Sequence, residues 1–380
     1  NGYMVGGCVR DIYMQRTPKD YDVVTTLTPE EVRERVPIAY AIGEKFGTLC
    51  IETSDVGIVE VTSARADITA GRHPTVCFTT DIIKDLQRRD FTMNALLMDA
   101  SGNMFGAATG IKDIDNDLIK CVGVASDRLH EDRLRALRAI RFSLQLWMDI
   151  DVELSNALYN FDLKIGAELA GTRVMDELKK MFAVNAAEAI QELDSYNLLI
   201  QIFPEVVILK HCKENQKWHI GEDTSFVHTM NVLQRAQKYN FTVQIAALLH
   251  DIGKAVVRKN ICTSYHGHAR AGKLLIQRIS ERLLWSNDLR EACEFVCENH
   301  MKMHVIEEMR AIKRKTLYES KHFDTLFKVH MCDKDLQADD AHIQWIVNDM
   351  KQLLAEPLLI NGHDIIKFGI VGARVGELKE

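Results

Sequence analysis

Two adjacent glycines, followed a short distance later by two alternating aspartates, constrain this chain more than any other feature. Gly6 and Gly7 follow an apolar stretch, and Arg10 lies in the helix-like segment after them. Glycines at such a strand-to-helix turn leave bare backbone open to a ligand, and the start of a helix favours an anion. Asp20 and Asp22 open a β-branched stretch that predicts a strand, so their carboxylates point to one face, roughly 6–7 Å apart. A phosphate cradle beside two carboxylates suits Mg²⁺, which combines a few protein carboxylates with substrate phosphates.

Each half of this pattern also has an ordinary interpretation. A Gly-Gly pair is usually a turn, and Asp-x-Asp is common on exposed strands. Their order and spacing together indicate a nucleotidyl-transfer site. A second segment, residues 88–95, has the sequence Arg-Arg-Asp-Phe-Thr-Met-Asn-Ala, which by itself predicts only the start of a helix.

These two segments resemble the first and second motifs of the class II tRNA nucleotidyltransferases and bacterial poly(A) polymerases, in the polymerase-β superfamily. The resemblance implies that Asp20 and Asp22 are catalytic and hold Mg²⁺. It also implies that Asp90 accepts hydrogen bonds from the ribose hydroxyls, which would select ribose over deoxyribose. The nucleotide-binding residues implied here are Gly6, Gly7, Arg10, Arg89, Asp90 and Asn94. Glu60 is either a third metal-facing carboxylate or, more commonly for a strand glutamate, a solvent-facing side chain.

A third informative segment, residues 131–142, has no helix breaker and predicts one continuous helix. One of its faces carries charged residues at steps of three, namely Asp132, Arg135, Arg138 and Arg141. Interpreted as structure alone, this is a surface helix with salt bridges along it.

The same face also has a chemical interpretation. Cytosine and adenine present an amino donor beside a ring-nitrogen acceptor, and guanine and uracil present the reverse. A carboxylate beside a guanidinium matches the first pattern, so Asp132 and Arg135 are expected to accept C and A and to reject G and U. The segment resembles the fourth motif of the same family, which acts as an amino-acid template. Arg138 and Arg141 would reach base or phosphate.

The C-terminal half contains a separate candidate metal site. His250 and Asp251 end a strongly apolar predicted helix, with His228 about twenty residues earlier. A lone histidine there would usually be a satisfied core residue, but an adjacent His-Asp pair is harder to explain in that way. The segment resembles the HD-superfamily metal-dependent phosphohydrolases, which implies His228, His250, Asp251 and Asp333 as ligands. Such a mixed nitrogen and oxygen set suits Ni²⁺, Mn²⁺, Co²⁺ or Mg²⁺. Accessory positions of some members are matched by His266, His268 and His300.

The overall prediction is an α+β head with a mixed sheet, followed by an all-α neck and body. The head is a polymerase-β-like nucleotidyltransferase domain at residues 1–98, and it includes a predicted hairpin of strands 42–51 and 56–62. The neck, residues 99–172, would recognise the base. The body, residues 173–380, would contain the HD-type domain at about 220–340.

Composition limits the partners of this chain. Its formal net charge of −7 means that an RNA would meet a local basic stripe instead of a basic surface overall. Nine cysteines without a Cys-x-x-Cys pair indicate reduced thiols, so we expect a cytoplasmic protein. No apolar segment reaches the length of a membrane span, so no membrane partner is expected.

The function predicted from the sequence is template-independent addition of CMP and AMP, from CTP and ATP, to the 3′ end of tRNA. Within the same chemistry, a poly(A) polymerase or a partial enzyme adding only C-C or only A remains open. An alternative of another class is an HD phosphohydrolase with a nucleotide-binding head, acting on 2′,3′-cyclic phosphates or phosphomonoesters at RNA ends. A pure RNA-binding module is the weakest alternative, because aromatic residues are not interleaved with a basic segment.

Overall fold

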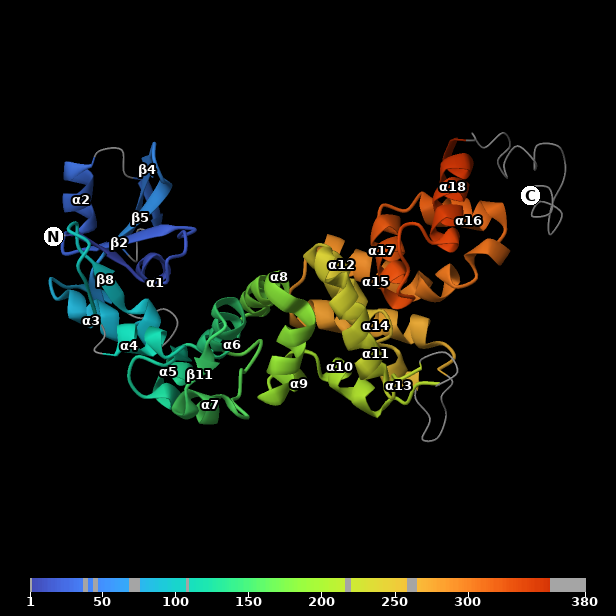
Figure 1. Cartoon of the computed structure of the whole chain (residues 1–380), viewed down its shortest axis with the longest axis horizontal. Coiled ribbons are helices and arrows are strands. Elements are labelled where there is room, and N and C mark those ends of the chain that lie inside the picture. The colour runs from blue at the N-terminus through green and yellow to red at the C-terminus, as the bar shows by residue number, and fades with distance from the viewer. Residues whose placement is uncertain are drawn as a thin grey trace. The chain divides into compact units, whose positions relative to one another are not determined.

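The computed structural model describes residues 2–36, 40–43, 47–67, 76–106, 109–215, 220–257 and 265–355 of the 380. The chain divides into two compact units, one of residues 1–164 and 196–198 and the other of residues 165–195 and 199–380 (Figure 1). The first unit contains both the predicted head and most of the predicted neck. The three-domain division with boundaries after residues 98 and 172 stays a prediction.

A seven-stranded mixed sheet forms the centre of the head, as predicted. Its strands, in spatial order, are β3 (Tyr40–Gly43), β4 (Thr48–Thr53), β5 (Gly57–Ser63), β2 (Tyr21–Thr25), β1 (Gly2–Val5), β8 (Leu96–Met98) and β9 (Met104–Gly106). β2 and β5 pair in parallel, and the other neighbours pair antiparallel. The predicted hairpin is confirmed as β4 and β5. Its first strand begins at Thr48, because residues 40–43 form the separate strand β3.

Alternating side chains of the strands build a core on each face of the sheet. On one face, Val24 of β2 packs with Leu86 of α3 (Ile82–Gln87). On the other face lies Val32 of α2 (Pro29–Arg35), whose cluster includes the neighbouring β2 residue, Val23. α2 begins in a capping box that Thr28 and Glu31 form. Because side chains on a strand alternate, Asp22 lies on the same face as Val24.

The rest of the first unit is mainly helical. Its elements are β6 (Arg65–Asp67), β7 (Val76–Phe78), α4 (Gly110–Asp115), β10 (Leu118–Ile119), α5 (Ala125–Glu131), α6 (Leu134–Leu146), β11 (Asp149–Ile150) and α7 (Val152–Leu158). α4 is attached to the head by Asp113, whose buried carboxylate accepts hydrogen bonds from the Thr92 and Thr109 hydroxyls, each at 2.7 Å. The first residue of α4 is Gly110. A larger residue would not fit there, because its Cβ would lie 2.7 Å from the Thr92 carbonyl oxygen.

The prediction of one continuous helix over residues 131–142 is wrong. The chain leaves α5 at Asp132, whose backbone is extended, and starts α6 at Leu134. The carboxylate of Asp132 accepts the Leu134 backbone N–H at 3.2 Å, and its carbonyl accepts the Arg135 N–H at 2.9 Å. Aspartate offers an alternative to the helical ladder in this way, which is why it prefers helix starts.

The described part of the second unit is built from helices and connecting turns, as predicted. The elements are α8 (Gly171–Ser195), α9 (Leu199–Ile202), α10 (Pro204–Ile208), α11 (Ser225–Arg235), α12 (Phe241–Leu249), α13 (Lys254–Val257), α14 (His268–Arg282), α15 (Asn287–Met303), α16 (Ala311–Tyr318), α17 (Phe323–Asp333) and α18 (Ala341–Ala355). Among the described helices, none has the length and apolarity that crossing a bilayer requires.

Candidate active site and metal centre

The glycine turn between β1 and α1 (Gly7–Tyr13) lies against an arginine of the second motif. Gly6 has φ +83°, a conformation that side-chain-bearing residues rarely adopt. A Cβ on Gly6 would lie 2.8 Å from Arg89 Nη1. Arg89 is oriented by Asp85, a fully buried carboxylate on α3 that contacts Arg89 Nη2 at 3.3 Å and Arg88 Nη2 at 2.8 Å. The bare turn therefore has a guanidinium directly beside it, and Asp85 is a supporting residue that the sequence analysis missed.

A chain of hydrogen bonds joins residues of three separate motifs in the first unit. Arg10 Nη1 donates to Asn94 Oδ1 at 2.6 Å. Asn94 Nδ2 donates to Asp90 Oδ1 at 3.0 Å, and Arg138 Nε donates to Asp90 Oδ2 at 2.7 Å. The glycine-rich segment, the second motif and α6 are thus fixed to one another, although the sequence separates Arg10 from Arg138 by more than a third of the chain.

Electrostatics keep Asp90 ionised in this arrangement. Its burial would raise the pKa, but the charge of Arg138 and hydrogen bonds from Asn94, Arg138 and the Phe91 backbone lower it to about 2. The carboxylate therefore acts as an acceptor throughout the physiological pH range.

The two predicted catalytic aspartates lie at the start of β2, with Asp20 directly before the strand and Asp22 within it. Asp22 pairs in register with Glu60 of the parallel neighbour β5, which places both side chains on one face of the sheet. Burial, followed by the charges of Asp20 and Glu60, raises the pKa of Asp22 to about 6, against the lowering effect of Arg89. Mutual repulsion of this kind is what a divalent cation relieves, so the carboxylate set fits Mg²⁺. Glu60 is exposed but faces the same group, so the solvent-facing interpretation does not fully describe it.

The predicted base-reading pair does not lie on one helix face, because Asp132 precedes α6. Arg135 Nη1 donates to Glu131 Oε2 at 2.8 Å and to the Arg128 carbonyl at 3.0 Å. Its Nη2 donates to the Arg88 carbonyl at 2.9 Å, which connects α6 to the second motif. Arg135 is thus fixed to the second motif, but Asp132 is not a helical residue, so the two do not share a helix face as predicted.

A ring that the sequence analysis did not single out lies among the arginines. The guanidinium carbons of Arg10, Arg138 and Arg141 are 5.2, 5.3 and 3.9 Å from the centroid of the Phe142 ring. Arg141 Nη1 also donates to Gln145 Oε1 at 2.7 Å. Cations over an aromatic face are attracted by its quadrupole, so Phe142 helps to hold three like charges together. In the sequence, the signal for this role of Phe142 was its position directly after the Arg-x-x-Arg spacing of residues 138–141.

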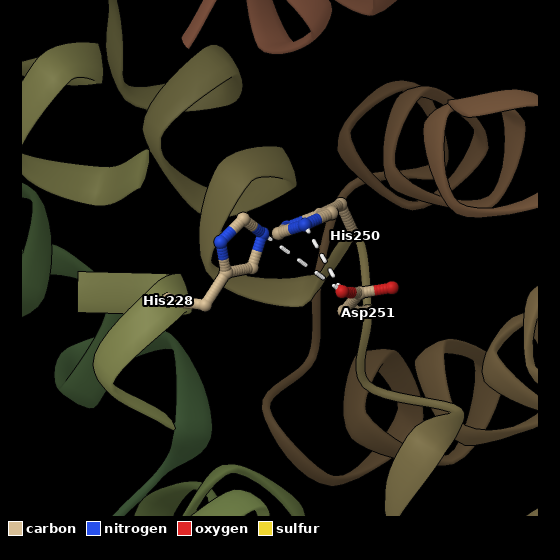
Figure 2. A group of neighbouring side chains, drawn as sticks. All are labelled: His228, His250 and Asp251. Atoms are coloured by element: carbon tan, nitrogen blue, oxygen red, sulfur yellow. Dashed lines mark ion pairs between the residues drawn. The ribbon is translucent and has the colours of Figure 1, made fainter. Parts of the chain in front are cut away.

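The second unit brings the predicted HD residues together in its interior. His228 comes from α11, His250 and Asp251 follow α12, and Asp333 ends α17. Figure 2 shows His228 and His250 both directed at the same carboxylate oxygen of Asp251, with their Nε2 atoms 4.0 and 3.4 Å from Asp251 Oδ2. His228 Nε2 also lies 3.1 Å from Asp333 Oδ1. His228, His250 and Asp251 thus form one group of potential ligands, and Asp333 contacts this group through His228.

The ring orientations are those of metal-binding histidines. His250 Nδ1 is 2.8 Å from the Ala247 carbonyl oxygen, and His228 Nδ1 is 2.8 Å from Glu222 Oε2. These contacts hold a proton on Nδ1 and leave Nε2 with its lone pair toward the centre. His250 Nε2 is buried and has no hydrogen-bond partner among the described residues. The donor set and its support thus fit a divalent metal.

The other oxygen of Asp251 faces two of the three accessory histidines. His268 Nε2 and His300 Nε2 lie 3.2 and 3.3 Å from Asp251 Oδ1, and each Nδ1 contacts a backbone carbonyl. His266 is exposed and is not part of the described cluster. Lys254 completes the surroundings. Its Nζ lies 2.7 Å from both Asp251 Oδ2 and Glu214 Oε1. Burial opposes this charge, but the two carboxylates raise the lysine's pKa above its ordinary value.

Comparison with known families finds matches to three segments of the chain. Residues 2–120 match the family model of the poly A polymerase head domain, and residues 225–329 match the HD domain. Between them, residues 167–209 match the probable RNA and SrmB-binding site of polymerase A. A CCA-adding enzyme of Staphylococcus aureus is 36% identical over 220 residues, which cover 56% of this chain and 53% of that protein. The chain is thus similar to poly A polymerase head domains over residues 2–120 and to CCA-adding enzymes over about half of its length.

Other similar proteins extend the comparison. The CCA-adding enzyme of Oceanobacillus iheyensis is 36% identical over 234 residues, 60% of this chain and 57% of the relative. The chain thus spans about half the length of the curated relatives it matches. A structure of the Bacillus stearothermophilus CCA-adding enzyme in complex with CTP covers 100% of this chain, with 86% of its own length aligned, 21% identity and a TM-score of 0.64. A Thermotoga maritima CCA-adding enzyme complexed with tRNA has a TM-score of 0.58 at 18% identity, covering 100% and 85%. These likenesses establish the fold.

Proposed function

We propose that the protein adds CMP and AMP to the 3′ end of tRNA, using CTP and ATP and releasing diphosphate. The observation that carries the proposal is the hydrogen-bonded chain from Arg10 through Asn94 and Asp90 to Arg138. It connects the segment after the glycine turn, which would bind the nucleotide phosphates, to α6, which carries the predicted base-reading residues. CCA-adding enzymes are among the curated relatives that match the chain, which supports the same choice.

In this mechanism the head residues bind and orient the reactants. Asp20 and Asp22 would hold Mg²⁺, which when bound activates the attacking 3′-hydroxyl and stabilises the departing diphosphate. Arg10 and Arg89 flank the bare glycine turn and would neutralise the triphosphate. Asp90 is ionised and would accept the ribose hydroxyls. Each of these interactions positions a charge or a hydroxyl without covalent participation of the protein.

We propose that base choice belongs to the start of α6. Asp132 and Arg135 remain the candidates for reading the Watson–Crick edge of C and A. Arg138 and Arg141 lie next along α6, around Phe142, where a base or phosphate would meet them. Since Asp132 lies in an extended segment before α6, its carboxylate is positioned by its cap interaction and not by a helical stripe.

The experiment that tests this proposal uses a tRNA transcript that lacks the terminal C-C-A. Each labelled nucleotide is supplied alone, and CTP and ATP are then supplied together. We expect three nucleotides to be added with CTP and ATP and none with GTP or UTP. Asp22→Asn should abolish addition, whereas Asp55→Asn, in the exposed turn between β4 and β5, should not. A long adenylate tail, or addition that stops after C-C or requires a preformed C-C end, would contradict the proposal and identify one of the two alternatives.

A second activity is favoured by the His and Asp cluster of the second unit. We propose that this unit hydrolyses phosphate esters at RNA ends, including 2′,3′-cyclic phosphates, with Ni²⁺, Mn²⁺, Co²⁺ or Mg²⁺ held by His228, His250, Asp251 and Asp333. His250→Ala should abolish this hydrolysis and leave nucleotide addition intact. If Asp22→Asn preserved the main activity and His250→Ala removed it, the protein would instead be a phosphohydrolase with a nucleotide-binding head.

We also propose a cytoplasmic location. The eight described cysteines are all free, and seven of them are buried. Free thiols in this number are typical of a reducing compartment.

A further inference from the structure

A third group of potential metal ligands adjoins the HD centre at Asp333, whereas His268 and His300 adjoin it at Asp251. It consists of His304, directly after α15, with His330 and Asp333 of α17. Each offers one ligand atom, and these atoms all lie within 4.8 Å of one another. His330 is 2% exposed, so the group is rooted in the interior.

The ligand atoms of this group are close enough together to share one ion. His304 Nε2 lies 3.1 Å from Asp333 Oδ2, and the rings of His304 and His330 meet edge to face at 5.5 Å between centroids. Ligands at about 2.0–2.1 Å from a tetrahedral divalent ion lie roughly 3.3 Å from each other. An ion between these side chains therefore requires only small movements of their ends.

A fourth histidine contacts His330 at the edge of the group. His342, on α18, places its Nε2 atom 3.1 Å from His330 Nε2. Its Nδ1 is 2.7 Å from Glu307 Oε1. A carboxylate at Nδ1 holds the proton there and directs the Nε2 lone pair inward, which is the usual support of a metal-binding histidine.

Asp333 connects this group to the predicted HD centre. Its Oδ1 faces His228, whereas its Oδ2 faces His304. Asp251 has the same two-sided arrangement between His250 and the accessory histidines. Each of the two aspartates thus lies between two sets of histidines and directs one carboxylate oxygen toward each set.

We propose that His304, His330 and Asp333, with His342 as fourth donor, bind a divalent transition-metal ion at a site separate from the predicted HD centre and sharing Asp333 with it. Three imidazoles and one carboxylate oxygen favour Zn²⁺, Ni²⁺ or Co²⁺ over Mg²⁺, which prefers oxygen ligands. Because its ligands come from the end of α15, from α17 and from α18, the ion would also cross-link these helices.

The test measures metal stoichiometry in the full chain, free of any affinity tag. The protein is stripped with a chelator, titrated with Co²⁺, and followed by visible absorption and by elemental analysis after desalting. We expect His304→Gln to bind one equivalent less than the wild type and to lose one component of the Co²⁺ spectrum. His342→Gln should weaken the same component at least tenfold. His211→Gln, which alters an exposed histidine of the same unit, is the matched control and should bind as the wild type does.

A second comparison keeps the test decisive if a single variant is poorly folded. His250→Ala removes a ligand of the HD centre but none of the proposed site, so it should retain an ion that the double variant His250→Ala/His304→Gln loses. Circular dichroism establishes that each variant is folded. Equal stoichiometry and identical Co²⁺ spectra for the wild type and His304→Gln would overturn the proposal, as would equal metal content in His250→Ala and the double variant.

Discussion

Asp22→Asn should make the metal-free protein more stable while it abolishes nucleotide addition. Burial and the neighbouring charges of Asp20 and Glu60 raise the pKa of Asp22 from 3.8 to about 6. The folded-state pKa therefore lies above that of the unfolded chain, and the ionised carboxylate destabilises the fold at neutral pH. A neutral amide of nearly the same shape removes this cost.

The size of the effect follows from the shift. At about 1.4 kcal/mol per pKa unit, a shift of about 2 units corresponds to at most about 3 kcal/mol. Asp22 is only half-buried, and solvent screening reduces this to roughly 1 kcal/mol. The gain should be full above about pH 6 and should vanish below about pH 4, where Asp22 is protonated in both states.

The assay is thermal unfolding of wild type and variant in EDTA and in Mg²⁺, between pH 4 and pH 8. In EDTA at pH 7.5 we expect the variant to melt at the higher temperature, and Mg²⁺ should stabilise the wild type more than the variant, since an ion that binds the native state alone raises its stability. The exposed Asp55→Asn serves as the control. A variant no more stable than wild type in EDTA would refute the electrostatic argument, and equal stabilisation of both proteins by Mg²⁺ would refute the role of Asp22 as a ligand.

Three further predictions concern the glycine turn, the start of α6 and the HD centre. Gly6→Ala should lower the free energy of unfolding by roughly 1–3 kcal/mol, because of backbone strain and the displaced Arg89 guanidinium, and should abolish addition. Gly57→Ala is the control, since Gly57 has φ +77° and no atom within 4 Å of the added Cβ. In unfolding experiments it should show the backbone strain alone. Asp132→Ala should cost about 1 kcal/mol as a lost helix cap and should also admit GTP or UTP in the addition assay; Asp151→Ala, which removes the cap of α7, should lose similar stability without changing nucleotide choice. Chelator should lower the melting temperature of the second unit in the wild type, because the buried carboxylates lose their cation, and should lower it less in His250→Ala; equal shifts in both would contradict metal binding at this centre.

Local signals in the sequence were sufficient to predict the fold class. The capping box at Thr28, the β-branched strands and the apolar helix before His250 each depend on neighbouring residues, and all three are present in the structure. The break at Asp132 was missed because its neighbours are strong helix formers and because a single aspartate is compatible with either a helix surface or a cap. Only the tertiary position of α5 and α6 decides between these, and periodicity carries no information about it.

The site was predictable to the extent that its residues form short motifs. His228, His250, Asp251 and Asp333 were identified from spacing and resemblance, and they meet in space. Residues that act through distant contacts were not identifiable in this way. Asp85, which orients Arg89, and Phe142, which lies among three guanidinium groups, look like an ordinary helix acid and an ordinary core ring in the sequence.

The arginine partners observed here also limit how a nucleotide can bind. Arg10 contacts Asn94 and Asp11, Arg138 contacts Asp90, and Arg135 contacts Glu131 and backbone carbonyls. Asp90 already accepts a hydrogen bond from Arg138, so a nucleotide whose ribose bound Asp90 would have to displace that arginine. Exchange of one polar partner for another contributes little net free energy, because the lost contacts offset the new ones. It favours selectivity, since a nucleotide unable to replace every displaced partner leaves buried charges unpaired. On this argument, the cluster around Asp90 and Arg138 contributes more to the choice of nucleotide than to its affinity.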